Sequence, residues 1–107
     1  MRIYLAGPMR GIPQLNFPAF HLAAAKLRAE GHEVFNPAEE DEKVHGPNGE
    51  RCNFTSRDAL KRDFAWLCDH AEGIAFLPGW DDSRGAVAEF FVARALGLEF
   101  TFLGDDS

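Results

Sequence analysis

Short apolar runs alternate along the chain with longer segments whose apolar residues recur at helical spacing. Four runs predict buried β-strands, at residues 3–6, 32–35, 73–77 and 98–103. The run 73–77 is uniformly apolar, which is typical of a parallel strand covered on both faces. Because helical segments separate the strands, the pattern predicts an α/β fold with a mostly parallel sheet and right-handed crossovers.

Helix signals bound the three predicted helices. The first follows Asn16 as N-cap, carries Pro18 in its first turn and stops at Gly31. The second is capped by Thr55 or Ser56, and the third runs over residues 83–96.

Between the second strand and the second helix, the polar segment 38–55 predicts one long loop, which follows a strand break at Asn36-Pro37. A loop of that length in a compact domain is often functional, for example as a lid, or else mobile. Ligands of an open parallel sheet bind outside the carboxyl ends of its strands, so we expect a site around residues 7–11, 36–37, 78–83 and 104.

Composition narrows the function classes. The 107 residues fit one domain, 1–107, and the net charge of -6 argues against a partner that is a nucleic acid polymer. No apolar run approaches the ~18–20 residues that cross a bilayer, and no signal peptide is evident, so we expect no membrane partner. Cys52 and Cys68 lack metal or redox spacing, which favours a reducing, cytoplasmic setting. The scattered histidines lack ligand spacing, so we expect no metal and no cofactor.

Glu89 lies inside a predicted helix that is apolar almost all the way round. Burying an unpaired carboxylate costs several kcal/mol or forces it to take up a proton, so a chain that keeps one there has a use for it. The structural alternative is a buried glutamate paired with an arginine. A helix that is apolar on all sides also needs a second cover, and a partner subunit is the simplest one.

Asp63 lies at the edge of the apolar stripe of the second predicted helix, where the alternative is a rim aspartate within a solvated run of charges. Two carboxylates in different environments suit cleavage of a glycosidic bond, because one attacks the anomeric carbon while the other handles a proton. Tyr4, in the first strand, could reach a carboxylate, or could simply pack in the core.

Two glycine-containing turns are candidates for binding an anion. Ser83, Gly85 and the first-turn N–H groups of the third helix form one, and Gly7, Arg10 and Gly11 belong to the other. Neither turn matches a known phosphate-binding fingerprint, so a purely structural role remains open for both. The indole of Trp80, in the turn beside the site, could stack on a nucleobase.

Three blocks in this order resemble the nucleoside 2-deoxyribosyltransferase superfamily: residues 3–11, residues 62–67, and Ser83-x-Gly85-Ala86-x-x-Glu89. The nearest branch is similar to the 2'-deoxynucleoside 5'-phosphate N-hydrolases, because Ser83 stands six residues before Glu89. The resemblance implies a flavodoxin-like or Rossmann-like three-layer sandwich with strand order 2-1-3-4, and a homodimer or larger homo-oligomer.

The resemblance also implies roles for individual residues. Glu89 would be the nucleophile at C1' of the deoxyribose, Asp63 would protonate the leaving base or position it, and Tyr4 would orient Glu89. A phosphate or sugar hydroxyl would be held by Ser83, Gly85 and Arg10. The expected partner is therefore a nucleoside or nucleotide, cleaved by water in a hydrolase or by another base in a transferase.

The short segment after the last strand and the long 38–55 loop motivate two alternatives. One is a nucleotide-binding module without chemistry, and the other is an oligomeric scaffold with a vestigial site.

Overall fold

A computed structural model describes residues 1–45 and 56–104 of the protein. Its four-stranded sheet has the order β2-β1-β3-β4 with every pairing parallel, as the sequence predicts. The strands are β1 (Arg2–Ala6), β2 (Glu33–Phe35), β3 (Gly73–Phe76) and β4 (Glu99–Phe102). The helices are α1 (Phe17–Ala29), α2 (Pro37–His45), α3 (Ser56–His70) and α4 (Arg84–Leu96), with short 3-10 turns η1 (Pro13–Asn16) and η2 (Trp80–Asp82).

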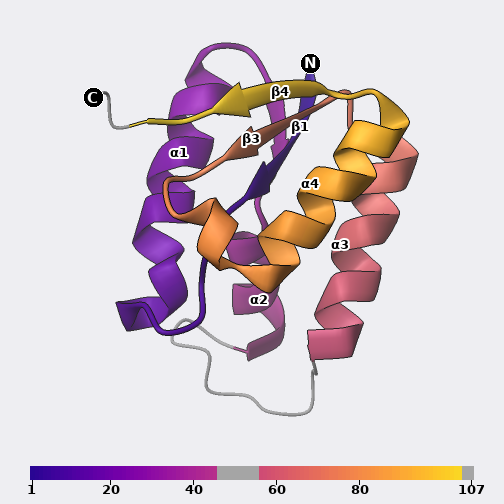
Figure 1. Ribbon diagram of the computed structural model, residues 1–107. Helices are drawn as coiled ribbons and strands as arrows, with labels where there is room; N and C mark the ends of the chain where they lie inside the picture. The colour runs from indigo at the N-terminus through magenta and orange to yellow at the C-terminus, as the bar shows by residue number, and fades with distance from the viewer. Residues whose placement is uncertain (46–55, 105–107) are drawn as a thin grey trace.

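Alternate residues of the central strands face opposite layers, which makes a three-layer sandwich. Ile3 and Leu5 of β1 pack with the apolar face of α1, while Tyr4 and Ala6 pack with residues of α3 and α4. Figure 1 shows α1 on one side of the sheet and α3 and α4 together on the other. The fold is therefore an α/β sandwich of the flavodoxin-like kind.

The start of the predicted loop 38–55 is helical instead, so that prediction is wrong for residues 38–45. Asn36 Oδ1 accepts a hydrogen bond from the Ala38 N–H at 2.9 Å, and Pro37 occupies the first helical position. Glu39 and Glu40 then lie in the first turn, where the helix dipole favours negative charge. Asn36-Pro37 and the acidic residues that follow, for which the sequence pattern predicts a strand break and a polar loop, are therefore signals for the start of a helix. Residues 46–55 lie outside the described part of the chain.

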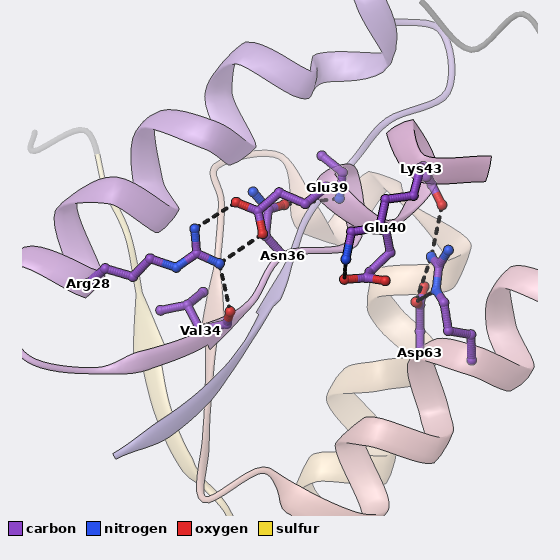
Figure 2. A network of polar contacts seen from close by, with 10 residues as sticks. Arg28, Val34, Asn36, Glu39, Glu40, Lys43 and Asp63 are labelled. Atoms are coloured by element: carbon purple, nitrogen blue, oxygen red, sulfur yellow. Dashed lines mark hydrogen bonds and ion pairs between the residues drawn. The ribbon is translucent and has the colours of Figure 1, made fainter. Parts of the chain in front are cut away.

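Charged side chains, together with the fully buried Ala38, attach α2 to its neighbours. The Arg28 guanidinium of α1 donates to both carboxylate oxygens of Glu39, at 2.6 and 2.9 Å, and to the Val34 carbonyl at 2.9 Å. Figure 2 shows these contacts on one side of α2 and Asp63 of α3 on the other. On the α1 side, His21 also pairs with Glu42 at 3.0 Å. Electrostatic contacts therefore contribute to the docking of α2.

The entry to α1 differs from the predicted one. Asn16 occupies the N-cap position, but its side chain donates to the Pro8 carbonyl at 2.8 Å and makes no cap hydrogen bond. Gln14, Leu15 and Asn16 all have positive φ, between 53° and 62°, which is strained for residues with a Cβ. The contact with Pro8 ties this turn to the loop after β1.

The apolar circumference of α4 is only partly covered within the chain. Its buried residues are Ala86, Glu89 and Ala93, whereas Phe91 is 57% exposed and Leu96 47%. Among the residues described, no helix combines the length and apolarity needed to span a membrane.

Asn36→Ala is expected to lower the free energy of unfolding by about 1–2 kcal/mol, because it removes the cap of α2 from a buried position. Urea denaturation measures the loss. Asn36→Ser is the matched control, since its hydroxyl still accepts at the N-cap and should recover part of the stability. An alanine variant as stable as the original chain would contradict the capping role.

Candidate active site

A cavity of about 940 Å³ opens at the carboxyl ends of β1 and β3, as expected for this topology. Its walls come from β1 and the loop after it, α2, α3, the turn 78–83 and the start of α4. The structure brings seven of the predicted site residues to this one cavity: Tyr4, Gly7, Arg10, Asp63, Ser83, Gly85 and Glu89. Gly11 and Trp80 are not among its lining residues.

The Glu89 side chain projects from α4 to the sheet. It is 6% exposed, and its Oε2 accepts a 2.7 Å hydrogen bond from the phenol of Tyr4, which is fully buried on β1. Among the residues described, the partner of Glu89 is this phenol rather than an arginine, so the structural alternative of a glutamate–arginine pair is wrong.

Burial dominates the proton affinity of Glu89. Loss of solvent raises the pKa of its carboxyl to about 8, the Tyr4 hydrogen bond lowers it, and the nearby Asp63 charge raises it. The pKa of Tyr4 is raised well above its usual value, first by burial and then by the negative charge of Glu89 and Asp63. The phenol therefore remains a proton donor to Glu89 at any ordinary pH.

Unlike Glu89, the Asp63 carboxylate lies next to a positively charged side chain. Its carboxyl is 8% exposed, and its Oδ1 lies 2.8 Å from Arg62 Nε and 2.7 Å from Arg62 Nη2. Burial raises the pKa of Asp63 to about 6, while the charge and hydrogen bonds of Arg62 lower it. Two carboxyls with separate proton affinities thus line one cavity, the arrangement that acid–base division requires.

The turn at the start of α4 has one internal hydrogen bond and open space beside it. Ser83 Oγ accepts from the Ala86 N–H at 3.2 Å, so the hydroxyl caps the helix. A Cβ built on Gly85 would have only Ser83 Oγ nearby, at 4.0 Å, so a ligand can approach the backbone there. Arg84, which the sequence reading did not select, also lines the cavity.

The glycines of the other turn serve the fold. A Cβ on Gly7 would lie 2.8 Å from the Leu77 Cβ, so close packing of the turn against residue 77 requires glycine there. Gly11 has a φ of 79°, which is the left-handed region that glycine adopts without strain. Arg10, between them, lies on the cavity wall.

The structure does not bring Trp80 to the cavity, in contrast to the expected stacking on a base. Its indole packs against Phe76 and Phe90, with ring centroids 4.7 and 5.2 Å away. An aromatic side chain after a strand end packs on its neighbours when they offer a larger apolar area than the ligand side.

The family model described as "Domain of unknown function (DUF4406)" matches residues 1–102. The chain belongs to this family. No curated protein and no solved structure matches it.

Besides Arg84, two further polar residues of this DUF4406 domain lie at or next to the site and were not predicted from the sequence. They are Asp41 and Arg62. Asp41 lies on the cavity wall from α2, and Arg62 joins it to Asp63. Recognising Asn36-Pro37 as a helix start would have placed Asp41 on a helix near the site. In the part of the chain that is described, no group of three or more His, Cys, Asp or Glu could hold a metal ion.

Glu89→Gln is expected to stabilise the DUF4406 domain at alkaline pH. The pKa of about 8 in the folded state lies above the ordinary 4.5, so the folded state binds the extra proton and stability falls as pH rises between these values. The glutamine cannot ionise, so above pH 8 the free energy of unfolding of the variant should exceed that of the original chain by on the order of a few kcal/mol. Denaturation at several pH values measures this. The control, Glu99→Gln at an exposed position, should leave the pH dependence unchanged, and a Glu89→Gln variant that does the same would contradict the burial argument.

Proposed function

We propose that this protein cleaves the N-glycosidic bond of a 2'-deoxynucleoside 5'-monophosphate, with Glu89 and Asp63 as catalytic residues. One observation carries the proposal: two buried carboxyls in different environments line the same cavity, close to the N-terminus of α4. That arrangement matches the chemistry of glycosidic bond cleavage, in which one carboxylate attacks and the other moves a proton.

The cavity dimensions support a nucleotide-sized ligand. Its volume of about 940 Å³ falls within the roughly 300–1,000 Å³ typical of small-molecule sites. Gly85 and Glu89 are four residues apart on α4, which is about 6 Å along a helix. A phosphate at the helix N-terminus would thus lie about one pentose away from the Glu89 carboxyl, with Arg10 and Arg84 on the same cavity wall.

The proposed reaction has two displacement steps. An oxygen of Glu89 attacks C1', the bond from C1' to the base nitrogen breaks, and its electron pair leaves with the base as Asp63 donates a proton to it. Water then attacks C1' while Asp63 accepts a proton from it, and the glycosyl ester breaks to restore the Glu89 carboxylate. The products are the free base and 2-deoxyribose 5-phosphate. A second base in place of water would make the reaction a transfer.

The proton must move within the pair before the first step. At neutral pH the empty site favours a protonated Glu89 and an ionised Asp63, since their pKa values are about 8 and about 6. The reactive form has the opposite distribution, which costs about 3 kcal/mol for two pKa units. Positive charge that develops at C1' in the transition state stabilises an ionised Glu89 and offsets this cost.

A homo-oligomer is part of the proposal. The exposed Phe91 and Leu96 side chains on α4 are the kind of apolar surface that a second copy would cover.

The second candidate is a nucleotide-binding module without turnover. The burial of Glu89 favours it: because burial raises the pKa of this carboxyl to about 8, the protonated form at neutral pH can donate a hydrogen bond to a bound ligand. Calorimetry separates the two functions, because tight binding that survives Glu89→Gln, with the nucleotide recovered intact, would support the binding module.

Release of free base from a panel of deoxynucleoside monophosphates tests the catalytic proposal. We expect Glu89→Gln to reduce turnover to background, since it removes the nucleophile, and Asp63→Asn to reduce it by about 10²–10⁴-fold, since it removes the proton donor. Chromatography of the products measures release, with water alone and with added bases as acceptors. Mass spectrometry should find a covalent glycosyl adduct on Glu89.

Asp69→Asn is the matched control, because it removes an exposed carboxylate from the same helix as Asp63 and should keep full activity. The proposal would be contradicted for these substrates if no free base is released from any member of the panel with either acceptor. A Glu89→Gln variant with unchanged turnover would contradict it as well.

The pH dependence of kcat/KM is a further test. One carboxyl of the pair must be protonated and the other ionised, so the profile should be bell-shaped with limbs near 6 and 8. Steady-state assays between pH 5 and pH 9 measure both limbs. A flat profile across this range would mean that these two groups do not carry the reaction.

A further inference from the structure

The Arg62 side chain contacts two carboxylates from different helices. Its Nη2 lies 2.7 Å from Asp63 Oδ1 on its own helix and donates to Asp41 Oδ1 of α2 at 2.8 Å. Adjacent helical residues do not normally face each other, so Arg62 must fold back along α3 to reach Asp63. The contact with Asp41 holds the guanidinium in this folded-back position.

Asp41, the second carboxylate that Arg62 contacts, lies on α2, and this helix contacts its neighbours through charged side chains. Glu39 and Glu42 pair with α1, and Asp41 pairs with α3 through Arg62. Asp41 also lines the cavity, so the position of α2 shapes the site wall as well as the surroundings of Arg62.

From this geometry we propose that Arg62 is a positioning residue: it divides its charge between Asp41 and Asp63, and the docking of α2 thereby sets how readily Asp63 gives up its proton. This inference rests on the proposed function for its catalytic meaning, but its physical content is measurable without substrate.

Within the described parts of the chain, four groups face Asp63 from the elements packed around it. Arg62 of α3 favours the ionised carboxylate and the charge of Asp41 on α2 opposes ionisation, while the hydroxyl of Tyr4 on β1 donates its proton to Glu89. Glu89 of α4 is the fourth, since its own pKa is raised by the Asp63 charge and the repulsion acts both ways. Arg62 and Asp41 therefore act on Asp63 with opposite signs, although they are joined to each other.

The opposite signs make a sharp experiment. Carbon NMR of the side-chain carboxyls in the full chain, without ligand, follows the titration of Asp63 directly. Arg62→Gln removes the favourable charge and should raise the pKa of Asp63 above about 6. Asp41→Asn removes the repulsion and the carboxylate that competes with Asp63 for Arg62, so it should lower that pKa.

The matched control is Glu40→Gln, which takes a carboxylate off α2 and breaks only its pair with Lys43 on the same helix. It should leave the Asp63 titration unchanged. Arg62→Lys keeps the charge but loses the planar fork, so its titration should lie between those of the original chain and Arg62→Gln.

If Arg62 and Asp41 only held α2 in place, Arg62→Gln and Asp41→Asn would both release the helix. Both variants would then shift the pKa of Asp63 in the same direction. Equal directions, or a Glu40→Gln shift as large as the Asp41→Asn shift, would overturn the proposal. If Arg62→Gln does not fold, Asp41→Asn decides alone, and a raised or unchanged pKa of Asp63 counts against the proposal.

Failure of the proposed function would look different. If no substrate is turned over, the proposed function fails, but the titrations of Asp63 in these variants are still expected as described, because they are measured without substrate. If turnover is found, the acidic limb of the kcat/KM profile should move to lower pH in Asp41→Asn and to higher pH in Arg62→Gln.

Discussion

The hydrogen bond from Tyr4 to Glu89 connects the centre of the sheet to α4, and the geometry of the site depends on it. A carboxyl taken out of water loses several kcal/mol of solvation when ionised, and one phenol returns only part of this. The protein keeps the carboxyl there because Ala86 and Ala93 let α4 lie close to the sheet. A group that costs stability in this way is typical of a functional site.

The asymmetry between the two carboxyls comes from their helices. Glu89 is buried with a neutral phenol as its hydrogen-bond partner, whereas Asp63 has a guanidinium against one of its oxygens. Residues of similar chemistry thus acquire different proton affinities from their positions alone. The electrostatic docking of α2 adds a third element to the balance, because the guanidinium that serves Asp63 also holds that helix.

Two residues that the sequence offers as ligand-binding groups have packing roles in the fold. Gly7 is required by the approach of Leu77, and Trp80 belongs to an aromatic cluster with Phe76 and Phe90. The polar path of the cavity therefore runs from the start of α4 past Glu89 to Asp63, and apolar side chains form much of the remaining wall.

Strand–helix alternation and uniformly apolar strands determined the parallel sheet and its ligand-binding edge, because both follow from local periodicity. Glu89 was identifiable for the same reason, as a charge within an apolar helix. The sequence alone did not determine α2, since Asn36-Pro37 serves equally as a strand break and a helix start, and only the cap to Ala38 decides. The resemblance implied that Tyr4 orients Glu89, but residue spacing did not decide between that contact and a core role for Tyr4, and nothing in the sequence joined Asp41 to Arg62. A phenol lies 85 residues away from Glu89, and Asp41 lies 21 residues from Arg62, so these contacts exist only when the layers are assembled.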